Sequence, residues 1–365
     1  MLCKTLAVSK TLAVGKSIAA LALTAAFALP TQAQEVIKLT LATGVPAVSL
    51  TNVELSNTFT AALNDELAKR GNKFKVEWTI GHAGTILKLP ALFQGASDGV
   101  ADMVVMTQAF EQAKLPLQNV AFVAPFNGAD HRQAMKAFDD TNNAIPAMRD
   151  AFDKNNTVYL GALGFDYYIL QSKQNIKSFE DLKGRKVGGI GPNLSWVRVA
   201  GATGVQASLA TVYNDMQSGI FDAMITTPTA SGSIKLQEVA PFILDAGLGA
   251  HPVTLAVFNK SRWQKLPKDV QDAVRVAFER FRESYFKRLD DGIKTSIDGM
   301  TKGGGTFISM SAAERQRWAQ ALPPLGLDWA KDMEAKRQPG REVLTRYLEN
   351  LRKNGAQPSR AWDKE

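Results

Sequence analysis

The chain has 365 residues, of which 45% are hydrophobic and 21% are charged, as in an ordinary globular protein. A chain of this length is expected to form about two lobes rather than a single core. Its formal net charge of +8 at pH 7 is spread along the sequence without a dense run of Lys and Arg, which argues against nucleic-acid binding. Cys3 is the single cysteine, which excludes an internal disulfide and a site with several Cys ligands.

The first 33 residues have the layout of a secretory signal peptide. A leader with three lysines and no acidic residue precedes an apolar run from Ser17 to Leu29, and small residues stand at Thr31 and Ala33 before a predicted cut. The run is shorter than the roughly 20 residues that span a bilayer as a helix. We therefore expect cleavage near Ala33 and a periplasmic protein, which loses Cys3 and cannot count on cytosolic ATP or NAD. No cofactor is expected.

Strand-like and helix-like segments alternate along the first half of the remaining chain. Hydrophobic periodicity predicts strands at 36–43, 73–80, 101–106 and 157–163, and helices at 50–70, 86–94 and 131–154. Alternation at this spacing indicates βαβ units and a mostly parallel sheet.

A second series of the same kind begins near Gly164. It predicts strands at 167–173, 186–190, 222–226, 242–246 and 253–259, and helices at 195–202, 210–217 and 231–239. Because no linker rich in Gly, Ser or Pro separates the two series, we expect strands to join the lobes.

One unusually long helix is predicted over 262–300. After Pro267, apolar residues recur every three or four positions from Val270 to Ile297. A helix of roughly 30 residues is about 45 Å long, more than one lobe, so it can lie across both. A loop and strand follow at 303–310, and Ser311 and Glu314 form a capping-box pattern that opens another helix.

These segments together predict an α/β fold with two lobes, each a mostly parallel sheet flanked by helices, with strand hinges and one spanning helix. The expected organisation is a signal peptide at 1–33, lobe I at 34–160 plus about 249–275, lobe II at 161–248 plus about 300–330, the spanning helix at 262–300 and a helical tail at 330–365.

Several short motifs carry a resemblance to a known family. The segment SFEDLKGRKV at 178–187 resembles the S-x-x-D-L-K-G-x-K-[IV] element of receptor subunits of tripartite ATP-independent periplasmic (TRAP) transporters, the DctP-like family. The segment VFNKSRWQKLPKDV, which ends at Val270, is similar to that family's W-x-x-L-P-x-x-[VI] element. Weaker similarities occur at 96–103, 201–204 and 215–222, and the resemblance covers about residues 36 to 350.

The resemblance implies a two-lobed, periplasmic-binding-protein-like fold and a function without catalysis. Such a receptor captures a small organic solute between its lobes. It then delivers the solute to the small and large membrane subunits of a permease that an ion gradient drives.

The chain departs from the family where the solute is held. The family usually has an arginine after the K-[IV] pair and a second one in a G-[FT]-R element, and these bind the ligand carboxylate. Here those positions are Gly188 and Asp166. Near the family's acidic and amide segment the chain has Thr226 and Thr227 instead. We therefore expect a ligand that is atypical for the family, with an aromatic or bulky acid as the favoured class.

Three kinds of ligand contact stay open at this stage. An anion can be held by Lys88 or Arg198, or by backbone N–H groups at the helix start near Asn193, unless these bases are only solvated surface. A neutral or amine ligand can pair with Asp166, unless that carboxylate forms a structural salt bridge. An apolar cleft can be lined by aromatic and other residues that are otherwise core, with Trp196 favoured most: Phe165, Tyr167, Tyr168, Trp196 and Met224.

Other constellations are weak. His82, His131 and His251 lack metal-site spacing, although His82 and His251 adjoin predicted strand ends. No nucleotide loop or nucleophile motif is present, which disfavours a secreted hydrolase or lyase. The receptor of an ATP-driven importer remains the alternative, and the 262–300 helix argues against it. Sequence does not define the oligomeric state; a monomer is favoured.

Overall fold

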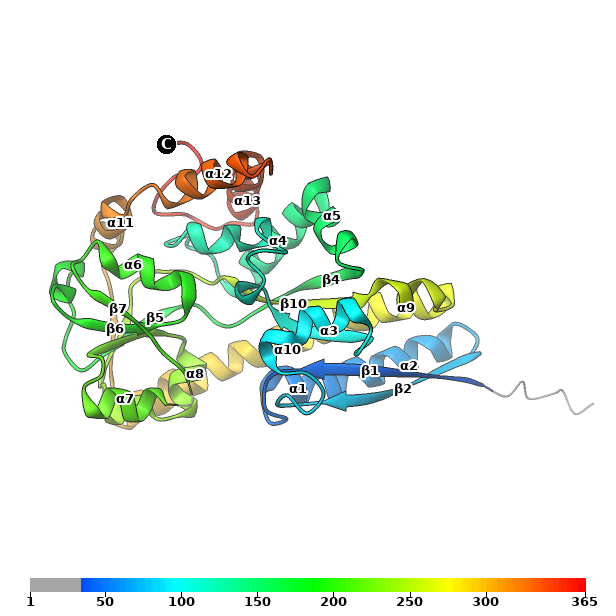
Figure 1. Cartoon of the computed structure of the whole chain (residues 1–365). Helices are drawn as coiled ribbons and strands as arrows, with labels where there is room; N and C mark the ends of the chain where they lie inside the picture. The colour runs from blue at the N-terminus through cyan, green and yellow to red at the C-terminus, as the bar shows by residue number, and fades with distance from the viewer. Residues whose placement is uncertain (1–33, 210) are drawn as a thin grey trace, which may run out of the picture. The chain divides into compact units, whose positions relative to one another are not determined.

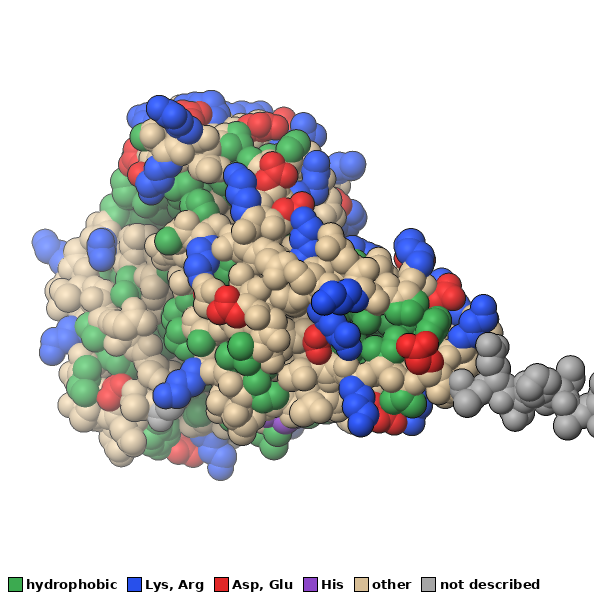
Figure 2. Space-filling view, turned by 45° about the vertical axis from the view of Figure 1, so that its right-hand side comes forward, with side chains coloured by type: hydrophobic (Ala, Val, Ile, Leu, Met, Phe, Trp, Pro, Cys, Tyr) green, Lys and Arg blue, Asp and Glu red, His purple; other side chains and the backbone are tan. Residues whose placement is uncertain are grey.

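The computed structural model describes residues 34–209 and 211–365 (Figure 1), so the predicted signal peptide lies outside the described residues. Two β-sheets flanked by helices form the described part of the chain, which confirms the predicted α/β fold class. The lobe boundaries stay a prediction. On the face shown in Figure 2, basic and acidic side chains are interspersed rather than gathered in one basic patch.

The first sheet has the strand order β2-β1-β3-β10-β4. Its strands are β1 (Glu35–Thr43), β2 (Phe74–Gly81), β3 (Met103–Thr107), β4 (Thr157–Gly164) and β10 (Pro252–Asn259). β1 runs parallel to β2 and β3, whereas β10 runs antiparallel to both of its neighbours. The central strand β3 is buried on both faces at its first four residues, which explains its continuous apolar sequence.

Two helices predicted in this half are interrupted, one by a π-helical turn and the other at a proline. Helices α1 (Leu50–Glu54) and α2 (Thr60–Lys69) are joined by a π-helical turn, and α3 spans Leu92–Asp98. The helix predicted over 131–154 is two helices, α4 (His131–Ala144) and α5 (Pro146–Lys154). Ile145 between them is extended, because the ring of Pro146 disfavours helical backbone in the residue before it.

The second sheet has the order β11-β9-β5-β8-β6-β7. Its strands are β5 (Ile169–Ser172), β6 (Lys186–Gly189), β7 (Thr203–Gln206), β8 (Ala223–Thr226), β9 (Phe242–Asp245) and β11 (Thr306–Ser309). β5 runs antiparallel to both of its neighbours. The short edge strand β7 was not predicted, and α6 (Ser195–Arg198) is shorter than the helix expected there. Helices α7 (Val212–Ser218) and α8 (Pro228–Ser233) complete this half.

Two short segments cross between the sheets. The chain leaves the carboxyl end of β4 and enters β5 through residues 165–168, and it returns from β9 to β10 through 246–251. β4 is parallel to β1, β2 and β3, and β9 is parallel to β6 and β8. Each crossing therefore starts at the carboxyl edge of one sheet and ends at the carboxyl edge of the other.

The predicted long helix is α10 (Lys268–Lys302), preceded by the short α9 (Lys260–Lys265). The two are separate because Leu266, before Pro267, is extended. α10 contacts elements of both halves. Its Arg288 guanidinium pairs with the buried carboxylate of Glu54 in α1 at 2.7 Å, and the Tyr285 hydroxyl donates to the Gly164 carbonyl at 2.9 Å. Gly232 of α8 packs directly on Ser296 of α10.

Three helices follow β11: α11 (Ala312–Ala321), α12 (Leu325–Ala335) and α13 (Gly340–Lys353). The Ser311 hydroxyl accepts the N–H of Glu314 at 3.2 Å, so the predicted helix start is confirmed. The last residues return to the first half, where the buried Trp362 indole N–H donates to the Pro125 carbonyl at 2.8 Å.

The contact between α8 and α10 gives a test of the spanning helix. A Cβ added at Gly232 would lie 2.7 Å from Ser296 Cβ and 3.2 Å from Ser296 Cα, so Gly232→Ala must push the two helices apart. We expect it to lower the free energy of unfolding by about 1–3 kcal/mol in urea titrations. Gly299→Ala is the control. Gly299 lies on α10, and an added Cβ there would have no atom within 4 Å, so this change should raise stability by up to about 1 kcal/mol. Equal effects of the two would contradict the packing.

Candidate functional site

Four exposed apolar side chains follow the carboxyl ends of strands. Val48 follows β1, Phe110 follows β3, Phe165 follows β4 and Ile190 follows β6, and all four are large hydrophobic residues with at least 40% exposure. In open α/β sheets, ligands bind outside the carboxyl ends of the strands. Because the crossings bring the two carboxyl edges toward each other, this apolar edge is the candidate binding site.

Each crossing contributes one residue, Tyr168 or His251, to an aromatic cluster that also contains Trp196 and Phe122. The Trp196 ring lies 5.0 Å from His251 and 5.6 Å from Tyr168, measured between centroids. Phe122 stacks on His251 with an interplanar angle of 4°. Three predicted site residues that are far apart in the sequence are therefore in contact, and Phe122 was not predicted.

Trp196 is fully buried in this cluster. Its indole N–H donates to the Phe122 carbonyl at 3.1 Å, and its own carbonyl accepts the indole N–H of Trp318 at 3.0 Å. Trp196 thus joins the turn after β6 to the first half of the chain. Its predicted contact with the solute stays a prediction.

His251 is held between two carbonyl groups. Nδ1 lies 2.9 Å from the Ala121 oxygen and Nε2 lies 3.1 Å from the Leu248 oxygen. Burial lowers the pKa of His251 to about 4, with the two backbone contacts opposing that shift. The ring is therefore neutral at pH 7 and donates through only one nitrogen. It carries no positive charge with which to attract an acid.

Asp166 caps a helix instead of facing an ion-pair partner. Its carboxylate accepts the backbone N–H of Thr229 at 2.7 Å and the Thr229 hydroxyl at 2.9 Å, at the start of α8. Burial raises the pKa of Asp166, and hydrogen bonds from Thr227 and Thr229 offset only part of that effect. Among the described residues, no cation lies within salt-bridge distance of Asp166, so this carboxylate forms a helix cap rather than the structural salt bridge that was one alternative.

Thr226 and Thr227 are also engaged at this helix start. The Thr227 hydroxyl is the N-cap of α8 and accepts the N–H of Ala230 at 3.4 Å. The Thr226 hydroxyl accepts a hydrogen bond from Ser231 at 3.4 Å. Both residues are only 5% exposed, so they support the turn after β8.

Gly188 has no room for a longer side chain. A Cβ at this position would lie 2.9 Å from the Met224 sulfur and 3.2 Å from the Phe221 ring. These two apolar residues fill the space beside the strand where the family usually has an arginine. The packing around Gly188 therefore leaves no space for the arginine side chain that the family usually has.

The remaining predicted residues are more scattered. Asn193 is buried, and its amide oxygen accepts the N–H of Ile190 at 2.9 Å. His82 directly follows β2, and its Nδ1 is buried without a partner among the described residues. Lys88 and Arg198 are exposed, and the structure does not bring them to the aromatic cluster.

Sequence reasoning missed Val48, Phe110 and Ile190 as well as Phe122. Val48 and Phe110 stand a few residues past predicted strands, and Ile190 is the last residue of the predicted strand 186–190. An apolar residue at or just past a strand end was therefore the available signal. No comparable signal marked Phe122, whose role depends on contacts with residues distant in the sequence.

The described residues contain no cluster of three or more potential metal ligands. Within the same ranges, no helix is long and apolar enough to cross a membrane.

The cap at Asp166 can be tested through the pH dependence of stability. Asp166→Ala removes the acceptor for Thr229 and should lower the free energy of unfolding by about 1–3 kcal/mol at pH 7. Because the folded-state pKa is raised, the wild type should lose stability as the pH rises from about 3.9 through that pKa.

Asp166→Asn is the matched variant for the same experiment. It cannot titrate but keeps one oxygen for Thr229, so it should lose less stability than the Ala variant and lack that decrease with pH. Urea unfolding from pH 4 to pH 8 measures both effects. Identical pH profiles for wild type and Asp166→Asn would show that Asp166 does not titrate differently in the folded state.

Comparison with known sequences finds solute-binding proteins. A family model for bacterial extracellular solute-binding proteins of family 7 matches residues 51–332. A solute-binding protein of Albidiferax ferrireducens is 23% identical over 259 residues, which cover 69% of this chain and 75% of that protein.

Solved structures share the fold. A TRAP periplasmic solute-binding protein from Desulfovibrio salexigens, in an open complex, matches with a TM-score of 0.76 and 22% identity over 87% of this chain and 96% of that one. One from Rhodoferax ferrireducens, with copurified benzoate, matches with a TM-score of 0.71 and 20% identity over 87% and 98%. Others with this fold hold pyroglutamate, galacturonate or orotic acid.

The family model covers most of the chain, and the resemblance to TRAP receptors is confirmed. This protein belongs to family 7 of the bacterial extracellular solute-binding proteins, and it is a binding receptor rather than an enzyme.

Proposed function

We propose that this receptor binds an aromatic or bulky organic acid in the periplasm and delivers it to the small and large membrane subunits of a TRAP permease. The observation that carries the proposal is the apolar edge formed by Val48, Phe110, Phe165 and Ile190 behind the strand ends. Burying these side chains against an apolar ligand gives about 25 cal/mol for each Å² removed from water. A small, fully polar dicarboxylate gains little from such an edge.

The polar groups near the edge favour the same ligand class. With Gly188 packed against Met224 and Asp166 engaged as a cap, neither family arginine position offers a charge to a carboxylate. Lys88 and Arg198 are exposed and stay the proposed bases for the acid group. An anion held by an exposed lysine or arginine gains less than one in a buried bidentate pair, so apolar contact must supply much of the affinity.

Relatives of the same fold support an acid as the ligand without selecting one. Benzoate, pyroglutamate, galacturonate and orotic acid each appear with a different protein of this fold, so the scaffold tolerates different ring-containing acids. Benzoate is the ring acid that fits an apolar edge best. Family membership also favours a TRAP permease over the ATP-driven importer that was the alternative.

Delivery requires two states of the receptor. We propose that the lobes close around the solute by rotation at residues 165–168 and 246–251, the two segments that cross between the sheets. The solute can favour the closed state only if it binds that state more tightly. The monomeric state and the cleavage of residues 1–33 are parts of the proposal that rest on the sequence.

A thermal-shift screen of the mature protein tests the ligand class. Bound ligand raises stability by RT ln(1 + [L]/Kd). Benzoate, other aromatic acids and pyroglutamate should raise the melting temperature, whereas succinate and malate should not. Stabilisation by succinate or malate alone would exclude the proposed ligand class while leaving the receptor family intact.

The proposed apolar edge is tested with two isoleucines that are exposed to a similar degree. Ile190 follows the carboxyl end of β6 and is 46% exposed, whereas Ile220 precedes the amino end of β8 and is 49% exposed. β6 and β8 are parallel, so these residues lie at opposite edges of one sheet. Ile190→Ser should weaken binding of the solute found in the screen about tenfold in calorimetric titrations, because it removes one apolar contact of about 1.4 kcal/mol. Ile220→Ser should leave the affinity unchanged, and equal effects would contradict the proposed edge.

A further inference from the structure

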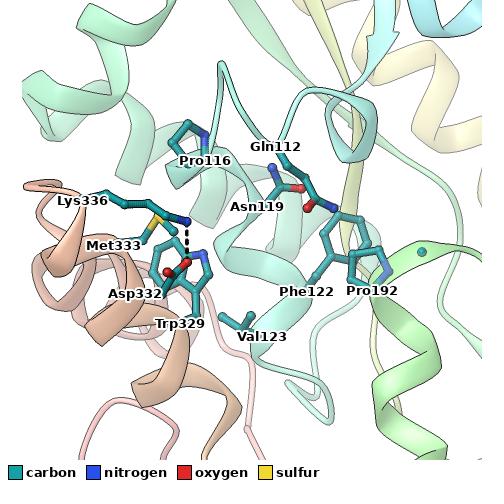
Figure 3. Close-up of a pocket in the computed structure, with 11 residues that line it drawn as sticks. Gln112, Pro116, Asn119, Phe122, Val123, Pro192, Trp329, Asp332, Met333 and Lys336 are labelled. Atoms are coloured by element: carbon teal, nitrogen blue, oxygen red, sulfur yellow. Dashed lines mark hydrogen bonds and ion pairs between the residues drawn. The ribbon is translucent and has the colours of Figure 1, made fainter.

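A cavity of about 400 Å³ lies between three parts of the chain that are distant in sequence. Figure 3 shows α12 on one side of it, the segment that contains Gln112 and Phe122 on another, and the turn with Pro192 on a third. None of the residues predicted for the solute site lines it. Its volume lies in the range of small-molecule sites.

The wall of this cavity is mostly apolar. Six apolar side chains, two of them large aromatics, line it: Pro116, Phe122, Val123, Pro192, Trp329 and Met333. Such a wall suits a flat ring. At α12, Asp332 and Lys336 form an ion pair of 2.7 Å with each other (Figure 3), so the cavity presents no net charge to a ligand.

One buried polar atom in the wall lacks a partner. Asn119 lines the cavity and is 8% exposed, and its amide N–H donates to the Leu115 carbonyl at 3.0 Å. Its side-chain oxygen is buried and has no hydrogen-bond partner among the described residues. A buried acceptor without a donor costs free energy that a ligand N–H can recover.

We propose that this cavity is a second ligand site for a neutral, planar molecule that carries an N–H donor, such as an aromatic amide. The ring lies between Trp329, Met333 and Phe122, and the donor binds the Asn119 oxygen once that side chain turns toward the cavity. Phe122 lines this cavity and also stacks on His251 of the aromatic cluster. None of the four residues of the apolar edge lines the cavity. This site does not depend on the proposed solute.

Two matched probes test the chemistry. Benzamide carries an N–H₂ group, and acetophenone has a methyl group in its place with nearly the same shape. Binding to the mature protein is followed by the Trp329 indole N–H signal in a ¹H–¹⁵N spectrum, which Trp329→Phe identifies. Benzamide should shift this signal and bind about tenfold more tightly than acetophenone, as expected for one recovered hydrogen bond of about 1.4 kcal/mol.

Three variants complete the test. Asn119→Leu should bring benzamide down to the affinity of acetophenone. Val123→Phe, at a half-buried position in the wall, should weaken binding of both probes by narrowing the cavity. Lys331→Ala, on an exposed position of α12, should change neither. The proposal is overturned if both probes bind wild type equally, if Asn119→Leu does not reduce the difference, or if the Trp329 signal does not respond. A failure here leaves the acid screen unaffected.

Discussion

The reach of two short chain segments is the constraint on which this structure depends. Residues 165–168 connect Gly164 at the carboxyl end of β4 to Ile169 at the start of β5. Fully extended, such a connection spans no more than about 18 Å. Residues 246–251 limit the return connection, from Asp245 to Pro252, to about 25 Å. The carboxyl edges of the two sheets therefore stay close to each other.

Indole hydrogen bonds reinforce this arrangement. Trp196 donates to the Phe122 carbonyl, Trp318 donates to the Trp196 carbonyl, and Trp362 donates to the Pro125 carbonyl. All three rings are fully buried, so each bond satisfies a polar group that has no access to water. The turn after β6, helix α11 and the end of the chain are thereby fastened to one stretch, residues 122–125. A change at that stretch would reach the second sheet through Trp196.

The fold was accessible from sequence because its determinants are local. Periodicity identified ten of the strands and the long helix, while Pro146 and Pro267 divided two predicted helices at the residue before each proline. The strand β7 was missed because TGVQ is too short and too polar to show a pattern. Local patterns predict less of the site, because its contacts join residues that are distant in the sequence. His251 was predicted because it adjoins a strand end, and Tyr168 and Trp196 because aromatic residues can line an apolar cleft. Their mutual contact and that with Phe122 depend on packing that no local pattern encodes.

The substitutions at the two family arginine positions are physically consistent with each other. A guanidinium at position 188 would have to displace Met224 and Phe221, and it would be desolvated among apolar atoms without a buried anion to pair with. The nearest candidate anion from the crossing, Asp166, is already engaged with Thr229 and has a raised pKa because of its burial. Restoring one arginine would therefore not restore a carboxylate clamp, because the apolar packing and the cap would both have to change. Position 188 thus offers apolar packing and position 166 a helix cap, and neither offers a cation, which supports the proposal that the ligand is recognised largely through apolar contact.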